Sequence, residues 1–405
     1  MKHLFKILGM ACLIAITNVA FFSCSDDEDN LPKSYKMQIN LNFNDDLSFE
    51  DLSDVKVSLT NEKGQEQIVD MIKASTEVTV LQGQYSLALT GKVTDVQTEY
   101  VAGKANLDLF ADASVSINVE KIYKSALIFK AIYTTGAGGG PGKTPTQDSY
   151  FEIVNNSDEV QYLDQLLLSS PMTGKTKNAW QANGYNDIYE SGQGVVIAFP
   201  GTGKDYPLEP GKSIVIANNA VDLNSLVEDK DPNKGKFVDL SKADWEIYVT
   251  PGNGEVDYKA PNMDVIFRNN KYMTAFGLGY FGRCYLLARL PQGMTPSQFA
   301  ADKKNVMTTP GTSGSIEFMM IPSKYVIDAV EIWNASETEH NNTFLPKDDA
   351  QGVLSSDAWQ GKCVRRKVVK IENGRPYYQD TNNSHNDFLR NQPLNPGVTP
   401  TEVDK

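Results

Sequence analysis

The stretch Asp148-Ser-Tyr-Phe-Glu-Ile-Val-Asn-Asn-Ser-Asp-Glu-Val-Gln-Tyr-Leu-Asp-Gln-Leu-Leu-Leu168 contains two strand-like runs separated by a turn. Tyr150 to Val154 has the alternation of a strand. The four residues from Asn155 to Asp158 have side chains that bond to their own backbone, and such residues favour tight turns. The chain then returns through Val160 to Leu168. The stretch therefore predicts a β-hairpin.

The segment from Tyr35 to Tyr123 has the same character. Met37 to Phe43 and Val55 to Leu59 place an apolar residue at every second position, and similar runs cover Val78 to Leu89 and Val115 to Val119. Such period-two runs, separated by turn residues, are typical of strands with one wet and one buried face. We predict a mainly all-β protein that begins with a small β-sandwich over residues 35–124.

The chain starts with a basic head and an apolar run that ends near a cysteine. Residues 1–6 carry two lysines and a histidine, residues 7–22 are almost entirely apolar, and Cys24 follows one residue later. This layout is typical of a secretory signal peptide, and the run is shorter than the ~20 residues of a membrane-spanning helix. One alternative is an ordinary secretory signal in which the cysteine occurs by chance.

The same segment resembles the lipobox of a bacterial lipoprotein, although Phe21 and Phe22 depart from the usual pattern. The resemblance implies a signal peptide over residues 1–23 and a lipid anchor on Cys24. An acidic tether over residues 24–34 follows, and it resembles the export signal of Bacteroidota surface lipoproteins, here Ser25, Asp26, Asp27, Glu28 and Asp29. This implies an outer-membrane protein exposed at the cell surface. The alternative is a solvated spacer that holds the domains away from the membrane.

The composition limits the class of partner. The chain has 405 residues, with 51 acidic and 38 basic side chains and a net charge of −13. Because such a charge repels the phosphates of nucleic acids, we expect no nucleic-acid partner. The length allows two or three domains, and the apolar run from Ala126 to Tyr133 predicts the start of a second domain over residues 125–402.

Five segments of this second domain, in order, resemble the lamin-tail domain, an immunoglobulin-like sandwich. They are Asp148–Leu168, Phe199–Ala217 with a turn at Pro210-Gly211, Val326–Trp333, Gly361–Arg366, and Asp380–Phe388 followed by Asn395–Gly397. The resemblance implies a lamin-tail-like β-sandwich that is split by a large loop-rich insertion at about 221–323. Within that insertion, Thr295 to Lys304 predicts a short helix with Pro296 in its first turn.

The segment Gly83–Leu87 resembles a strand of prealbumin-like modules, which have an immunoglobulin-like sandwich and usually act as spacers. Taken whole, the chain resembles an uncharacterised family of Bacteroidota outer-membrane lipoproteins, a domain of unknown function. Members are often encoded near TonB-dependent transporters. The resemblance therefore implies a possible partner, the barrel of such a transporter, and leaves the ligand unknown.

A glycine-rich segment, Ala137 to Thr144, fits a relaxed phosphate-loop pattern. A phosphate loop requires a helix directly after it, so that the helix N-terminus meets the anion. Here Pro145 leads into a strand-like run instead. We interpret the glycines as a long connection between strands.

Four cysteines are present, of which Cys12 lies in the predicted signal and Cys24 is the predicted anchor. Cys284 and Cys363 remain. An exported protein meets conditions that permit disulfides, but sequence spacing does not give the distance between two thiols. A disulfide and two buried free thiols therefore both remain open.

Few residues suggest chemistry. A zinc site would need His340 or His385 with a carboxylate, yet neither lies at a short ligand spacing. Asp380, Asn382 and Asp387 are weak candidates for a hard cation, because calcium prefers oxygen ligands. The alternative is a turn whose side chains bond to their own backbone. Nothing indicates a nucleophile with its base. We therefore expect no cofactor and no enzyme activity.

Aromatic residues in the insertion are the candidates for binding, because recognition residues are often carried on loops of a rigid sandwich. They are Trp245, Tyr258, Tyr272, Phe276 and Tyr280. The alternative is that these rings pack over the sandwich as a cover. We expect a surface-exposed binding or accessory protein that acts with a TonB-dependent transporter in nutrient capture. The rival hypotheses are a metal-assisted hydrolase and an adhesin or structural surface protein.

Overall fold

The structure, a computed structural model, describes residues 33–404 except 45–46, 95–98, 124, 138–147, 193, 251–255, 271, 280 and 292. Cys24, the predicted export signal from Ser25 to Asp29, Tyr280 and most of the glycine-rich segment therefore lie outside the described residues. Within the described residues, no helix is long and apolar enough to cross a membrane.

The first domain is a sandwich of two sheets. Its strands are β1 (Ser34–Asn42), β2 (Leu52–Asn61), β3 (Glu66–Asp70), β4 (Ser75–Leu81), β5 (Gly83–Val93), β6 (Glu99–Leu109), β7 (Ala113–Asn118) and β8 (Glu120–Tyr123). One sheet has the order β4-β1-β7 and the other β3-β2-β5-β6-β8. The alternating residues Met37, Ile39 and Leu41 are buried in its core with Val57 and Leu59. The predicted small sandwich is confirmed, although the run from Val78 to Leu89 is divided between β4 and β5.

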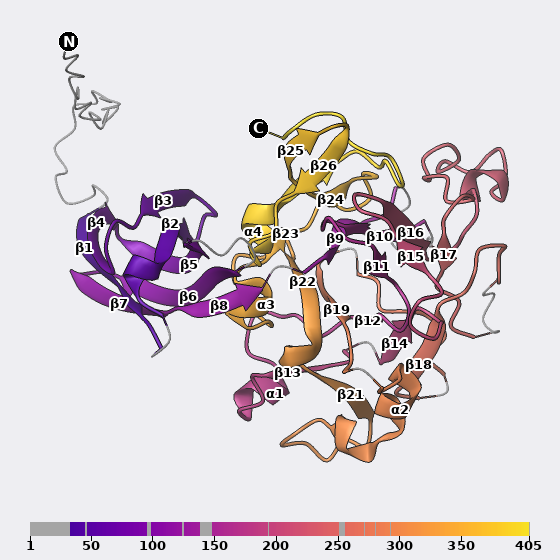
Figure 1. Ribbon diagram of the computed structural model, residues 1–405, viewed down its shortest axis with the longest axis horizontal. Helices are drawn as coiled ribbons and strands as arrows, with labels where there is room; N and C mark the ends of the chain where they lie inside the picture. Colours follow the sequence, from indigo (N-terminus) through magenta and orange to yellow (C-terminus); the bar gives the residue numbers. More distant parts are fainter. Residues whose placement is uncertain are drawn as a thin grey trace, which may run out of the picture.

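The second domain is a larger sandwich (Figure 1). Its first sheet has the order β17-β16-β10-β9-β24-β27. These strands are β9 (Leu127–Tyr133), β10 (Tyr150–Asn155), β16 (Ser213–Ala217), β17 (Trp245–Glu246), β24 (Cys363–Arg366) and β27 (Phe388–Gln392). Its second sheet has the order β18-β14-β12-β19-β22-β23. These are β12 (Leu167–Ser169), β14 (Val195–Ala198), β18 (Asp264–Arg268), β19 (Arg283–Ala288), β22 (Val326–Trp333) and β23 (Val353–Leu354).

Apolar side chains from both sheets form the main core of this domain. Phe151 on β10 packs edge-on against Tyr285 on β19, with ring centroids 4.8 Å apart. Such edge-to-face pairs add to the free energy gained by burying the rings. The mainly all-β sandwich architecture predicted from the sequence is therefore confirmed.

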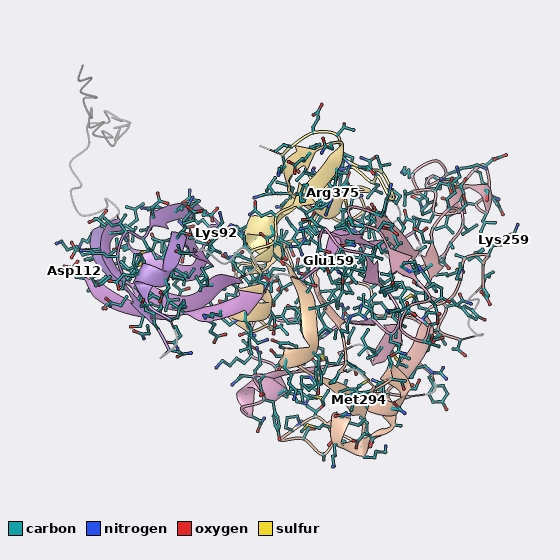
Figure 2. The ribbon with its side chains drawn as sticks, viewed as in Figure 1. Lys92, Asp112, Glu159, Lys259, Met294 and Arg375 are labelled. Carbon is teal, nitrogen blue, oxygen red and sulfur yellow. The ribbon has the colours of Figure 1, made fainter. Side chains whose placement is uncertain are left out.

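The remaining elements are small and lie around the two sandwiches. The strands are β11 (Gln161–Tyr162) with β15 (Pro207–Leu208), β13 (Ile188–Glu190) with β21 (Glu317–Pro322) and β20 (Val306–Thr308), and β25 (Val368–Glu372) with β26 (Arg375–Tyr378). The α-helices are α1 (Ala179–Ala182), α2 (Pro296–Ala301), α3 (Pro346–Asp349) and α4 (Ser384–Asp387). Helix α2 begins with Pro296, which confirms the predicted short helix. Arg375 on β26, labelled in Figure 2, forms an ion pair with Asp158 at 2.6 Å.

The predicted hairpin from Asp148 to Leu168 is wrong in its pairing. The strand β10 pairs with β9 and β16, whereas the returning strand β12 pairs with β14 and β19 in the other sheet. The turn lies where it was predicted, since the side chain of Asn155 accepts a hydrogen bond from the Ser157 N–H at 3.0 Å. All of β10 is buried, because Phe151 and Ile153 face the main core while Tyr150 and Val154 pack in two smaller clusters on the other face.

The insertion predicted at about 221–323 is also corrected. Three of its segments, β17, β18 and β19, are strands of the two main sheets. The strand β19 lies between β12 and β22 in the middle of its sheet. The strand has only six residues, so its apolar run in the sequence is short as well. A run of that length does not show that the segment belongs to a main sheet. The rest of the segment, which includes α2, β20, β21 and the loops between these elements, lies outside the two main sheets.

The two domains meet where β6 and β8 face α3 (Figure 1). The Lys104 ammonium donates to the Phe344 carbonyl at 2.7 Å, and Gln351 donates to the Thr60 hydroxyl at 3.1 Å. Ala102 and Ala350 pack together in the centre of this contact. The small sandwich is therefore attached to the second domain by packing as well as by the chain itself.

Candidate functional site

A groove of about 600 Å³ lies at one end of the first sheet of the second domain. It is found where β9 and β27 end and β24 begins, because these three strands are neighbours and β24 is antiparallel to the other two. Its volume is in the range of small-molecule sites in proteins. Its lining consists of Ala137, Lys236, Phe237, Val238, Trp359, Gln360, Gly361, Lys362, Pro393 and Leu394.

The backbone after β9 holds the wall of the groove in place. The Trp359 N–H donates to the Thr135 carbonyl at 2.8 Å, and the Gly361 N–H donates to the Gly136 carbonyl at 2.9 Å. The Thr135 hydroxyl donates to the Lys362 carbonyl at 2.6 Å. These bonds extend the pairing of β9 with β24 into the loop. The loop from Trp359 to Lys362 is therefore fixed on a rigid sheet.

Trp359 has an unusual backbone conformation, with a φ of +66°. A bulky side chain rarely adopts this left-handed conformation, which costs on the order of 1–3 kcal/mol and is concentrated at functional sites. Its indole is half-buried and meets the ring of Phe281 edge-on, with centroids 6.2 Å apart. The strained turn thus holds an aromatic ring at the groove.

The lining charges have one sign. Lys236 comes from the loop before β17 and Lys362 from the loop before β24, and none of the described residues that line the groove is an aspartate or glutamate. Asp148 lies behind the wall and is fully buried. It accepts hydrogen bonds from the Val238 N–H at 3.2 Å and from the Tyr133 hydroxyl at 3.1 Å. Burial raises the pKa of Asp148 to about 6.

Cys363 lies beneath the groove and Cys284 lies in the other sheet. Both are buried free thiols, so the predicted disulfide alternative is not formed. They belong to different core clusters because β24 and β19 lie in opposite sheets of the sandwich. Burial raises the pKa of Cys363 to about 12 and raises that of Cys284 well above its usual value. Neither thiol is therefore activated as a nucleophile.

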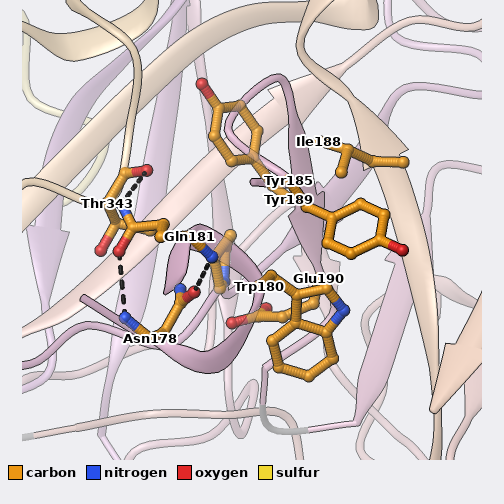
Figure 3. A pocket seen from close by; sticks show the side chains of 9 residues that line it. Asn178, Trp180, Gln181, Tyr185, Ile188, Tyr189, Glu190 and Thr343 are labelled. Atoms are coloured by element: carbon orange, nitrogen blue, oxygen red, sulfur yellow. Dashed lines mark hydrogen bonds between the residues drawn. The ribbon is translucent and has the colours of Figure 1, made fainter. Parts of the chain in front are cut away.

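A second, enclosed cavity lies beside α1 and β13 and is far smaller, at about 10 Å³ (Figure 3). This is room for one water molecule. Glu190 lines it and accepts hydrogen bonds from the Met172 N–H at 2.9 Å and the Gly192 N–H at 3.0 Å. Burial raises the pKa of Glu190 to about 8, so its carboxyl is mostly protonated at neutral pH. The cavity is too small for an organic ligand.

The oxygen-rich segment predicted as a weak cation site faces an arginine instead. The Arg366 guanidinium donates to Asp328 at 2.9 Å, to Asp380 at 3.0 Å and to Asp387 at 3.5 Å. The third candidate, Asn382, donates its amide to the Lys347 carbonyl. These oxygens thus have partners within the protein. Within the described residues, no group of three or more His, Cys, Asp or Glu side chains is placed to hold a metal ion.

The two histidines have separate structural partners. His340 stacks on Trp333 with the ring planes 5° apart and the centroids at 4.8 Å. His385 lies at the domain contact, with its Nε2 3.3 Å from a carboxylate oxygen of Glu66. The structure therefore does not bring the two imidazoles into one ligand set.

The aromatic candidates from the sequence have mixed outcomes. Trp245 is buried against Phe199 and Tyr206, and Phe276 is buried against Phe151. Both are core residues, so the packing alternative is correct for them. Tyr258 is half-buried over a neighbouring cluster, and Tyr272 is exposed by 77%. Tyr280 lies outside the described residues.

Sequence analysis overlooked the groove because its walls come from loops far apart in the chain. The only local signal was the pair of segments Lys234–Phe237 and Trp359–Lys362, each of which combines glycine, lysine and an aromatic ring. The structure places Phe281, a further aromatic residue of the segment 221–323, against Trp359.

Residues 209–394 match a family model described as a protein of unknown function, DUF4876. This segment contains both lysine-bearing loops of the groove. The chain is also similar to the crystal structure, at 2.50 Å resolution, of a DUF4876 family protein from Bacteroides thetaiotaomicron VPI-5482. The sequence identity is 27% and the TM-score 0.57, over 91% of this chain and 99% of that chain. No curated protein matches. The predicted resemblance to a Bacteroidota domain of unknown function is thus supported.

Proposed function

We propose that this chain is a surface-exposed outer-membrane lipoprotein that binds a ligand in the groove between Lys236 and Trp359. It acts as an accessory component of a TonB-dependent transporter in nutrient capture. The observation that carries the proposal is the groove itself, which has the volume of a ligand site and a rigid wall with an aromatic ring in a strained turn.

The position of the groove supports this role. The described chain begins in the small sandwich (Figure 1). The residues that line the groove all belong to the second domain. A lipid on Cys24 would tether the small sandwich to the membrane, since acyl chains provide stable anchoring. The groove would then be carried on the domain that is farther along the chain from the anchor.

The side chains at the groove are suited to binding a ligand and not to catalysis. Catalysis by a thiol would need an activated thiolate, and both thiols are buried with raised pKa values. Among the described residues, the groove is lined by two lysines and an amide and by no carboxylate, thiol or imidazole. These groups can attract and orient a ligand.

The test uses the full chain expressed in its own cells, with Cys24→Ser as the variant. We expect the wild-type chain to incorporate labelled palmitate, to fractionate with outer membranes and to co-isolate with one transporter barrel after mild cross-linking. The Cys24→Ser chain should lose the label and the membrane association. Recovery of the wild-type chain in the periplasm without lipid would contradict the location, and its isolation without a barrel would contradict the accessory role.

A further inference from the structure

We propose that the groove takes a small organic anion that carries a ring. Lys236 and Lys362 attract the anionic group, and the ring packs on the indole of Trp359. This inference rests on the proposed binding role of the groove and adds the chemical class of the ligand. Two sources share this chemistry, namely acidic saccharides and aromatic acids.

The sign of the charge along the groove favours an anionic ligand. The chain as a whole carries −13, yet the part of the groove lining that the structure describes contains two lysines and no aspartate or glutamate. Salt screens charges beyond a distance on the order of 8–10 Å, so a ligand in the groove responds mainly to the charges that line it. The groove is therefore a cationic site on an acidic protein, and it favours an anion.

The two cations of the groove are lysine ammonium groups and not guanidinium groups. A guanidinium favours planar, two-pronged bonding to an anion, whereas an ammonium is a compact charge on a flexible stem. Lys236 is exposed and Lys362 is half-buried, and they come from two different loops. Two such ammonium groups can approach one carboxylate, sulfate or phosphate from two sides. The site therefore distinguishes ligands by their charge more strongly than by the shape of the anionic group.

The indole of Trp359 provides an aromatic surface in the groove. Three of the four tryptophans are core residues, with exposures of 3% for Trp180, 5% for Trp245 and 8% for Trp333. Trp359 alone is half-buried. Its strained backbone is fixed by the bond to the Thr135 carbonyl. Together with the half-buried Phe237, it gives the groove an aromatic surface on which a ring can pack.

The first experiment measures the charge of the groove without a ligand. Trp359 is the tryptophan most accessible to quenchers in solution, so iodide and caesium report the potential beside it. At equal ionic strength, and normalised to free tryptophan amide, we expect the iodide quenching constant of the full chain to exceed that of caesium by about twofold or more. An iodide-to-caesium ratio of one or less would overturn the proposal.

Variants assign the signal to the groove. We expect Trp359→Phe to remove most of the quenching by either ion. The double variant Lys236→Gln/Lys362→Gln should lower the ratio to one or less. Lys303→Gln/Lys324→Gln removes two exposed lysines outside the groove and changes the net charge equally. It should keep the wild-type ratio, and a fall equal to that of the groove variant would contradict the assignment.

The second experiment measures binding by calorimetry with paired probes. Trigalacturonic acid is compared with its neutral methyl ester, and 1-naphthoate is compared with 1-naphthalenemethanol. We expect at least one acid to bind about tenfold more tightly than its neutral counterpart, with a preference that shrinks as salt is raised. Lys236→Gln/Lys362→Gln should abolish the preference, and Trp359→Ala should weaken binding of that acid. The acid that binds identifies the source.

The outcomes are separate from those of the proposed function. If neither acid binds better than its neutral counterpart, the ligand class is wrong, whereas lipidation and co-isolation with a barrel are unaffected. If the chain carries no lipid and meets no barrel, the location is wrong, whereas the quenching ratio still tests the groove.

Discussion

At the scale of single residues, Arg366 organises the buried charge of the second domain. It is 1% exposed in its side chain and lies against three carboxylates, and its guanidinium also packs over the Phe388 ring at 4.6 Å. Its Nε donates to the Phe129 carbonyl at 2.8 Å. A buried charge that loses its partner is strongly destabilising. This one side chain thus connects β24 with β9, β22 and the segment before β27.

We predict that Arg366→Gln lowers the free energy of unfolding by about 3–5 kcal/mol, because three carboxylates lose their buried cation. Urea denaturation at neutral pH measures the loss. The neighbouring Arg365, which pairs with the partly exposed Asp404 at 2.7 Å, is the matched control. Arg365→Gln should cost clearly less, and equal losses in the two variants would contradict this role of Arg366.

Glu190 makes a second residue-scale prediction, which concerns pH. Its folded pKa of about 8 is above the ordinary value of 4.5. Between pH 4.5 and pH 8, the Glu190 carboxyl therefore holds a proton in the folded protein that it has lost in the unfolded chain. This proton stabilises the folded state fully below about pH 4.5, and its contribution to the free energy of unfolding is lost as the pH rises to about 8. Glu190 alone is expected to contribute about −1.4 kcal/mol per pH unit to the free energy of unfolding inside this pH window.

Measuring the free energy of unfolding at several pH values between 5 and 8 checks this slope. Glu190→Gln should be less pH-dependent than the wild type, even if its stability at pH 5 is lower. Glu159→Gln, which changes an exposed carboxylate labelled in Figure 2, should keep the wild-type slope. Parallel curves for the wild type and Glu190→Gln would show that Glu190 does not titrate in this range.

At the scale of elements, the segment 221–323 contributes strands to the sandwich, and this predicts a contrast between two of its aromatic residues. Trp245 on β17 is buried, and its ring lies 5.2 Å from that of Phe199 and 4.9 Å from that of Tyr206. We expect Trp245→Ala to cost about 3–5 kcal/mol in unfolding free energy. Tyr272→Ala, at an exposed position, should stay within about 0.5 kcal/mol of the wild type. Similar losses in urea denaturation would contradict the topology.

Several elements were predictable from the sequence because their patterns allow only one structure. The alternation in β1 and β2 defines a strand with one buried face. Pairing was harder, since the turn after β10 is compatible with a hairpin and with a crossing between sheets. The strand β19 was assigned to the loop-rich insertion, because a short apolar run does not show which strands will be its neighbours. The groove was missed because chain folding, and not local sequence, brings residues 236–238 to residues 359–362.

At the scale of the whole molecule, the contact between the two domains predicts how they unfold. Ala102 is fully buried against Ala350, close to the acidic helix α3. We expect the wild-type chain to unfold in a single calorimetric transition. Ala102→Glu places a charge in this contact and should separate the transition into two. Asn106→Glu, at an exposed position on the same strand, is the control and should unfold like the wild type. A single unshifted transition for Ala102→Glu would contradict domain coupling.

The location of the molecule is the central claim, and cysteine labelling in living cells tests it most directly. Both thiols within the described residues are buried, so Gln360→Cys adds a reactive thiol at the exposed rim of the groove. We expect a membrane-impermeant maleimide to label this variant in intact cells as fully as in permeabilised cells. Labelling that appears only after permeabilisation would place the groove inside the outer membrane and contradict the account.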